Sequence, residues 1–178
     1  MRRLTMLAGA LGAALLMNSG AFAQVPADPN NPNETVPDKY NYTPYGETIK
    51  LADAKKVAEA ALAEATKRGW PMCIAVVSPS GDLVYFEKMD DCQYASVEIS
   101  QSKAKAAAVY RRPTVVFERL IAKGQYFAYL PTLGAGFIGS RGGNPIVVGG
   151  KVVGAIGVSG GTGSQDDAVS QAGVAALK

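Results

Sequence analysis

Two short motifs have the form of catalytic sites, but each lacks the partners that its chemistry needs. Residues 157–161 match the G-x-S-x-G nucleophile elbow, and residues 100–103 match the S-x-x-K pair of acylating enzymes. The chain has no histidine to act as general base for Ser159, and no S-D-N or K-T-G element accompanies Ser100 and Lys103. We therefore predict no catalytic residue from either motif, although Lys103 could still face a pocket.

The composition also argues against several kinds of metal site. The chain of 178 residues has no histidine and only two cysteines, which excludes His-ligated zinc or haem and disfavours iron–sulfur clusters. The acidic pairs 90–91 and 166–167 could bind a divalent cation. The first pair more simply ends a strand, and the second suits the first turn of a helix. We predict no metal site.

A glycine-rich run at residues 157–163 precedes a predicted helix. Backbone N–H groups in such a position, here those of Gly160 and Gly161, can bind a carboxylate or a phosphate. The alternative is a tight turn that lets the strand and the helix pack closely. Both interpretations stay open at this point.

Hydrophobic periodicity and turn residues predict the elements that position these groups. They indicate helices at 48–68, 95–110, 113–124 and 164–177, and hairpins at 72–78 with 83–89 and 145–148 with 151–158. Pro113 is predicted at the first position of its helix, and Ser164 with Asp167 as a capping box. Residues 125–133 read as a strand or a pocket wall, and residues 134–144 as a loop. The order predicts an α+β fold, with an antiparallel sheet of about five strands covered by helices.

The N-terminal residues have the form of an export signal. Arg2 and Arg3 precede an apolar stretch at 4–17, and Ala-Phe-Ala at 21–23 is a cleavage site. We expect residues 1–23 to be a signal peptide, and the mature protein to be periplasmic or secreted and free of the membrane. Residues 24–47 form a Pro- and Asn-rich extension, and its Tyr40, Tyr42 and Tyr45 could lie across the domain or a partner subunit.

The net charge indicates which partners to expect, and the two cysteines have to be considered together with the cellular compartment. The formal charge of +3, which falls to +1 when the two signal arginines are removed, predicts no nucleic-acid partner. An oxidising compartment makes a disulfide between Cys73 and Cys92 plausible. Two free, buried cysteines are the alternative.

Four stretches resemble the GlcG/HbpS family, which includes the C-terminal domain of PduO-type proteins. They are residues 51–65, 73–90, 96–114 and, most specifically, the run GGNPIVVGGKVVGAIGVSGGTGSQDDAVSQAGVAAL at 142–177. The resemblance covers residues 48–178. It implies a profilin-like α/β/α sandwich, symmetric homo-oligomers and a small-molecule ligand, with haem as the ligand of some members.

The resemblance suggests a ligand site built from residues 89–114 and the glycine loops. Its candidate residues are Met89, Asp90, Lys103, Tyr110, Arg111, Arg112, Thr114, Gly160 and Gly161. The arginines would bind haem propionates. Without histidine, the iron would be held by Tyr, Met, Cys or Thr, or by no side chain. The family often has MDGA where this chain has Met-Asp-Asp-Cys at 89–92.

These features predict an exported, oligomeric binding protein whose ligand is haem or a related tetrapyrrole. One alternative is an enzyme or accessory protein that acts on a small organic acid. In that case Arg112 and the glycine loop would hold the carboxylate, and Lys103 or Asp90 would be the acid/base group. A structural or interaction subunit is the second alternative.

Overall fold

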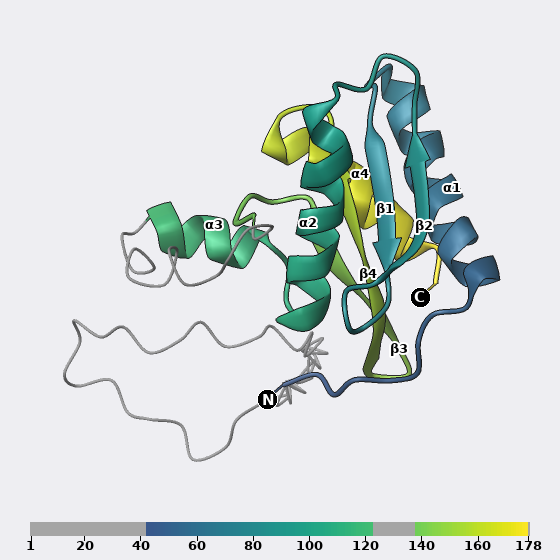
Figure 1. Ribbon diagram of the computed structural model, residues 1–178, viewed down its shortest axis with the longest axis vertical. Coiled ribbons are helices and arrows are strands. Elements are labelled where there is room, and N and C mark those ends of the chain that lie inside the picture. The colour runs from purple at the N-terminus through teal and green to yellow at the C-terminus, as the bar shows by residue number, and fades with distance from the viewer. Residues whose placement is uncertain (1–41, 123–137, 178) are drawn as a thin grey trace, which may run out of the picture.

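The computed structural model describes residues 42–122 and 138–177. Its elements are α1 (Leu51–Arg68), β1 (Cys73–Val77), β2 (Leu83–Lys88), α2 (Ala95–Val109), α3 (Val115–Ala122), β3 (Gly143–Val148), β4 (Lys151–Ser159) and α4 (Gly163–Ala175). The four strands form one antiparallel sheet in the order β2-β1-β4-β3. Helices α1 and α4 cover one face of the sheet, α2 packs on the other, and α3 lies to one side (Figure 1). The predicted α/β/α sandwich is confirmed.

Helix α1 shows how the sequence pattern becomes packing. Its five buried residues recur at helical spacing and turn one alanine-rich face to the sheet: Ala54, Val57, Ala58, Ala61 and Ala65. Gly69 ends the helix in the left-handed region, with φ of 67°, and its N–H bonds back to the last turn. Small side chains let the helix approach the strands closely.

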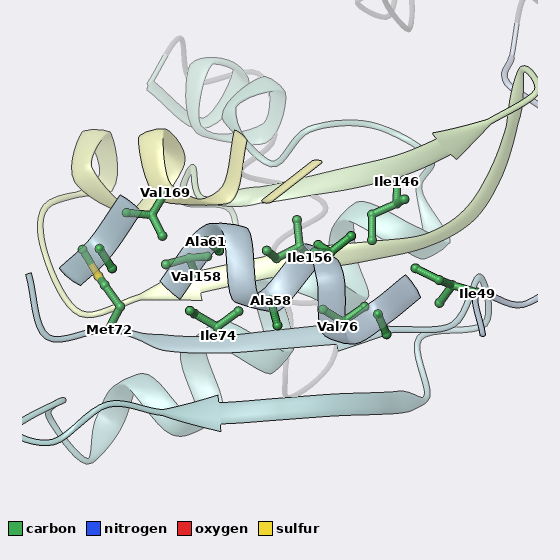
Figure 2. Packing of buried hydrophobic residues seen from close by; sticks show 13 residues of the cluster. Ile49, Ala58, Ala61, Met72, Ile74, Val76, Ile146, Ile156, Val158 and Val169 are labelled. Atoms are coloured by element: carbon green, nitrogen blue, oxygen red, sulfur yellow. The ribbon is translucent and has the colours of Figure 1, made fainter. Parts of the chain in front are cut away.

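Strand β1 is an interior strand of the sheet and is buried along its whole length. Its side chains alternate between the two faces. Ile74 and Val76 point to α1 and α4, where they join Ile156 of β4 in the larger apolar cluster (Figure 2). Ala75 and Val77 belong to a second cluster under α2. The strand therefore reads as an unbroken apolar run, as expected of a strand covered on both sides.

The close approach of α2 to the sheet depends on one position in β4. A Cβ atom at Gly157 would meet the backbone oxygen of Ser100 and the backbone nitrogen of Ala104. Only glycine therefore fits between this strand and the helix. Both hairpins around this centre, β1–β2 and β3–β4, are found where the sequence predicts them.

Several boundaries differ from the predictions. The described residues contain four strands, against about five predicted, and residues 125–133 lie outside the described part. Strand β3 begins at Gly143, inside the predicted loop, because the chain already pairs there with Gly157. Helix α3 begins at Val115, after Pro113, because its first hydrogen bond runs from the N–H of Glu118 to the carbonyl of Thr114, at 3.2 Å.

The capping box of α4 is also shifted by two residues. Thr162 and Gln165 form it, not Ser164 and Asp167. The N–H of Thr162 donates to the Gln165 side chain at 2.8 Å, and the N–H of Gln165 donates to the Thr162 hydroxyl at 3.4 Å. This frees Asp166 and Asp167, in the turn that follows, for contacts elsewhere.

The end of the N-terminal extension is part of the domain. Residues 44–49 run beside the start of β4, where Gly46 donates to the carbonyl of Val152 and Val152 donates to that of Pro44, both at 2.8 Å. The hydroxyl of Tyr45 donates to the carbonyl of Val109, at the end of α2, at 2.6 Å. The expectation that tyrosines of this segment lie across the domain is confirmed for Tyr45; Tyr40 lies outside the described residues.

Candidate functional site

The structure divides the candidate site residues among three places. Lys103, Thr114 and the glycine loops meet between α2, β3 and α4. Met89 and Asp90 follow β2. Tyr110, Arg111 and Arg112 lie at the C-terminal end of α2.

At the first place a buried ion pair joins α2 to α4. The Nζ of Lys103 lies 2.6 Å from an oxygen of Asp166, and the two side chains are 2% and 3% exposed. Lys103 also donates to the carbonyl of Val158 at 3.3 Å, and the second oxygen of Asp166 accepts from the N–H of Gly161 at 3.0 Å. Lys103 therefore faces the interior of the protein, and its ammonium is already partnered.

The same bonds also involve the glycine run. The N–H of Gly161 is used by Asp166 and that of Thr162 by Gln165. Gly160 packs against the backbone of Pro71 and Met72. The run has the form of a tight turn, and the amides of Gly161 and Thr162 are bonded to the chain's own side chains. An anion site at Gly160 and Gly161 stays a prediction from the sequence.

Thr114 is buried beside this ion pair and is fully engaged. Its hydroxyl accepts from the N–H of Gly143 at 2.9 Å and donates to the carbonyl of the same residue at 3.3 Å. The side chain is completely inaccessible to solvent. Thr114 thus fastens the start of β3 and presents no oxygen to a haem iron.

A second ion pair, between Glu118 of α3 and Arg141, borders the buried one. The Nε of Arg141 donates to Glu118 at 2.8 Å, and the backbone N–H of Arg141 donates to it at 2.9 Å. These bonds from Arg141 hold the pKa of Glu118 below its ordinary value, with a smaller contribution from the charge of Lys103. The same pairing raises the pKa of Arg141. Sequence reasoning missed both residues, because nothing local distinguishes a lone arginine in a glycine-rich loop.

The residues that follow β2 are likewise not arranged around a ligand. The sulfur of Met89 accepts from the N–H of Met72 at 3.4 Å, and its side chain packs on the α1 side of the sheet, opposite Thr114. Asp90 is exposed. Cys73 and Cys92 are joined in a disulfide, with their Cα atoms 6.1 Å apart. Of the two alternatives left open by the sequence, the structure has the disulfide, and neither thiol is available as a metal ligand.

The third place is a surface of rings and cations that we call the aromatic–arginine patch. It comprises Tyr42, Tyr45, Tyr110, Arg111, Arg112 and Phe117. The guanidinium of Arg111 lies 4.4 Å from the ring centroid of Tyr42 and 4.8 Å from that of Tyr45. The guanidinium of Arg112 lies 5.9 Å from the ring centroid of Phe117. The rings of Phe117 and Tyr110 meet edge to face, with their centroids 5.2 Å apart.

The patch is held in place by backbone features at the end of α2. Arg111 has a φ of 54°, a left-handed conformation that is uncommon outside glycine and that turns the chain sharply after the helix. The Nε of Arg112 donates to the carbonyl of Tyr110 at 3.1 Å. Tyr42, Tyr45 and Tyr110 keep 38% to 54% of their surface exposed. Of the candidate residues, those predicted for haem propionates are thus brought together with aromatic rings.

An arginine that lies on an aromatic ring can still bind an anion through its N–H groups. A guanidinium stacked on a ring uses its flat face, while its N–H donors point outward in the plane. Among the described residues, Arg111 lies over the rings of Tyr42 and Tyr45 and forms no ion pair. The patch can therefore accept a flat, apolar ligand that carries carboxylates.

The described residues also bear on the remaining alternatives. They contain no group of three Asp, Glu or Cys side chains placed to hold a metal ion. Within them, no helix is long and apolar enough to cross a bilayer. The parts of an organic-acid site are separated, since Lys103 is paired with Asp166, Gly161 serves that same carboxylate, and Asp90 is at the surface after β2.

The comparison with known sequences identifies the family. A family model described as "Haem degrading protein HbpS-like" matches residues 49–175. The chain belongs to this HbpS-like family. Among relatives, protein GlcG of Escherichia coli strain K12 is 40% identical over 107 residues, which are 60% of this chain and 77% of GlcG.

Solved structures agree with the HbpS-like assignment. The crystal structure of HbpS is 29% identical, with a TM-score of 0.67, and covers 75% of this chain and 92% of HbpS. The crystal structure of a complex of PduOC with haem has a TM-score of 0.68 at 23% identity, over 74% of this chain and 96% of PduOC. The second likeness is one of fold alone. The resemblance to the GlcG/HbpS family is confirmed.

Proposed function

We propose that this HbpS-like protein binds haem or a related tetrapyrrole on the aromatic–arginine patch. The observation that carries the proposal is that the guanidinium of Arg111 lies 4.4 Å and 4.8 Å from the ring centroids of Tyr42 and Tyr45, and that Arg112 lies over the ring of Phe117. A tetrapyrrole is a flat apolar disc with carboxylate side chains. Exposed rings would cover its face, and the guanidinium edges would bind its propionates.

The residues present fit haem as an anionic aromatic ligand, without a histidine for the iron. Tyrosine is a known haem ligand, and Tyr110 lies within the patch, in edge contact with Phe117. We propose Tyr110 as the side chain that would approach the iron, because of its place next to Arg111 and Arg112 in the chain. Bound haem would supply a redox-active metal; the chain itself would bind and orient it.

The comparisons support this choice of ligand. The matching family is described by haem degradation, and a complex with haem shares the fold. The organic-acid alternative has no comparable support, because the side chains that it needs are separated. We accordingly propose binding as the basic activity of the protein.

Titration of the purified protein with haemin tests the proposal. We expect a saturable shift of the Soret band at one haemin per chain. Arg111→Asn should weaken binding about tenfold or more, since a charge-assisted hydrogen bond contributes about 1.5–3 kcal/mol and 1.4 kcal/mol corresponds to a factor of ten. Asparagine is chosen because it tolerates the left-handed backbone of this position. Arg112→Gln should act in the same direction.

A matched control removes the same kind of contact elsewhere. Arg68 lies 4.9 Å from the ring centroid of Trp70 at the end of α1, so Arg68→Gln also breaks an arginine–ring pair. It should leave haemin binding unchanged. A wild-type signal that does not saturate would overturn the function. Saturable binding that is equally strong in all three variants would overturn the site.

We also propose that the protein is exported, on the basis of the signal-like residues 1–23. Cell fractionation and N-terminal sequencing of the mature protein test this. Periplasmic or secreted protein that begins at Gln24 is the expected result. A cytoplasmic chain that retains Met1 would contradict it.

A further inference from the structure

The two faces of the sheet are covered unequally. Helices α1 and α4 together pack on all four strands from one side, whereas α2 packs on β1, β4 and β3 from the other (Figure 1). Four strands spaced about 4.8 Å apart are wider than one helix with a diameter of about 10 Å. The part of β2 that faces the α2 side is therefore left without a helix of the described residues above it.

A shallow cavity of about 350 Å³ lies in this uncovered region, beside α2. Its size is within the range of about 300–1,000 Å³ that is usual for small-molecule sites. Its apolar part comes from Val77 of β1, Leu83 of β2 and Val97 of α2, and Leu83 keeps 52% of its surface exposed. The cavity therefore offers apolar area to a ligand that carries a nonpolar side chain.

One polar group on the helix side of the cavity has no partner. A serine inside a helix can bond to the carbonyl three or four residues earlier, and Ser100 does so with Val97 at 3.2 Å. Ser102 lines the cavity, is only 8% exposed and forms no hydrogen bond with any of the described residues. Its hydroxyl is still accessible, since no fully buried polar side-chain atom in the described part of the chain lacks a partner. Such a hydroxyl marks a place where a ligand would gain a hydrogen bond.

Two unpaired charges lie on either side of Ser102. Glu98 comes four positions before it and Lys105 three positions after it, so the three residues share one flank of α2, and all three line the cavity. Both charged residues are exposed, and neither forms an ion pair or a hydrogen bond within the described residues. Gln101 donates its amide N–H to the carbonyl of Val97 at 2.9 Å, which leaves the amide oxygen as an acceptor. The flank thus presents an acid, then a donor and an acceptor, then a base.

We infer that the cavity binds a short zwitterion with an apolar side chain, of the length of a dipeptide. The ammonium group of the ligand pairs with Glu98 and its carboxylate pairs with Lys105. Its peptide group, in the middle, accepts from the hydroxyl of Ser102 and donates to the amide oxygen of Gln101. The inference does not depend on haem binding, because none of these residues belongs to the aromatic–arginine patch.

The spacing of the two charges selects the ligand class. Glu98 and Lys105 are seven positions apart, which is about 10.5 Å along the helix at 1.5 Å per residue. An extended dipeptide spans about 7 Å, and the flexible side chains of the two residues cover the rest. A free amino acid carries its ammonium and carboxylate on one carbon atom, so it is too short to satisfy both residues and Ser102 at once.

Titration of the haem-free protein with L-alanyl-L-leucine, followed by NMR of the backbone amides, tests the inference. We expect saturable shifts at residues 81–83 and 97–105, and none at Arg111 and Arg112 of the aromatic–arginine patch. Ser102→Ala should weaken binding about fivefold, which is the usual contribution of one hydrogen bond. Ser100→Ala is the matched control in the same helix, since the Ser100 hydroxyl bonds to Val97, and it should leave the affinity unchanged. Circular dichroism checks that each variant is folded.

Blocked dipeptides assign the two charges separately. The N-acetylated dipeptide lacks the ammonium group, so it should bind the wild type about fivefold more weakly and should not respond to Glu98→Gln. The dipeptide amide lacks the carboxylate and should not respond to Lys105→Met. The unblocked dipeptide should respond to both substitutions.

The same titrations can overturn the inference in three ways. Shifts that do not saturate at millimolar dipeptide would reject the site altogether. Free L-leucine that binds as tightly as the dipeptide would reject the ligand class. Dipeptide binding that is unchanged in Glu98→Gln, Lys105→Met and Ser102→Ala would reject the assignment to this cavity. Haemin binding is measured separately, so a failure of one proposal leaves the other in place.

Discussion

Lys103 and Asp166 lie 63 positions apart in the chain and form an ion pair of 2.6 Å with both side chains almost completely buried. The pair connects α2, on one face of the sheet, to α4, on the other, past the end of β4. Asp166 also accepts the N–H of Gly161, so the glycine turn is fastened by the same carboxylate. One buried interaction therefore sets the position of three elements.

Removing one member of this pair should destabilise the protein strongly. Lys103→Met leaves the Asp166 carboxylate buried without a counter-ion, which we expect to lower the free energy of unfolding by about 3–5 kcal/mol. Asp166→Leu should have a similar effect. The double variant should lose less than the two single variants added together, because it leaves no isolated charge. Urea unfolding at pH 7 measures all three.

An exposed ion pair supplies the control for that experiment. Lys56 and Asp53 in α1 are 3.0 Å apart but 62% and 38% exposed, so Lys56→Met should cost less than about 1 kcal/mol. If Lys103→Met were as mild as Lys56→Met, the buried pair would not be holding the three elements together.

The disulfide should contribute to stability through the loop that it closes. Cys73 and Cys92 are separated by 19 positions, and a loop of this length is expected to stabilise the folded state by about 3 kcal/mol. Replacing both cysteines by alanine should lower the urea midpoint accordingly. A reducing agent should lower the midpoint of the wild type but leave that of the double variant unchanged. Equal midpoints for oxidised and reduced wild type would contradict this.

The Glu118–Arg141 pair predicts a pH dependence of stability. The pKa of Glu118 is lower in the folded protein than its ordinary value of 4.5, because Arg141 donates to the carboxylate. The contribution of Glu118 is therefore fully present above its unfolded pKa and is lost as the pH falls through the folded pKa. Glu118→Gln should be less stable than the wild type at pH 7, and the difference should shrink in acid.

Unfolding curves of the two proteins at pH 7 and in steps down to about pH 3 measure this difference. Asp53 pairs with Lys56 on the surface of α1, with side chains 38% and 62% exposed, and Asp53→Asn provides the reference for a surface ion pair. A stability gap for Glu118→Gln that grows toward low pH would have the wrong sign and would contradict the assignment.

Gly157 should be the least replaceable glycine of β4. A methyl group there would collide with the backbone of α2 at Ser100 and Ala104, so Gly157→Ala should cost about 3 kcal/mol or more through displacement of the helix. Gly149→Ala, in the turn between β3 and β4, introduces left-handed strain with no neighbour within 4 Å and should cost about 1 kcal/mol. Thermal unfolding of both variants checks the order of the two effects.

The elements of this fold were predictable because their signals are local. Apolar positions at helical spacing predicted α1 down to its last residue, Arg68, and paired glycines at 149 and 150 predicted the β3–β4 turn. The disulfide could be stated only as an alternative. Its formation depends on Cys92 reaching the start of β1, a distance that no sequence pattern contains.

The candidate site was predicted less well, and for a physical reason. Lys103 was picked from a short motif, but its partner Asp166 was interpreted as a helix-dipole residue, since a distant counter-ion leaves no local trace. The sequence of the glycine run is compatible with an anion site, because free amides at the start of a helix can bind an anion. The folded chain shows that one of these amides, that of Gly161, donates to the chain's own Asp166. The sequence singles out Arg111 and Arg112, but it does not show that the rings beside Arg111, those of Tyr42 and Tyr45, come from a segment far away in the chain.

The strand order has a consequence for how the polypeptide is made. β4 is an interior strand, yet it comes last among the strands in the chain and pairs with β1, which comes first. On the ribosome, β1 can meet β2 early, but its other edge stays open until β4 has been synthesised. The nascent chain therefore cannot complete the sheet before residues 151–159 have emerged. Loss of β4 would remove an interior strand of the sheet, not an edge strand.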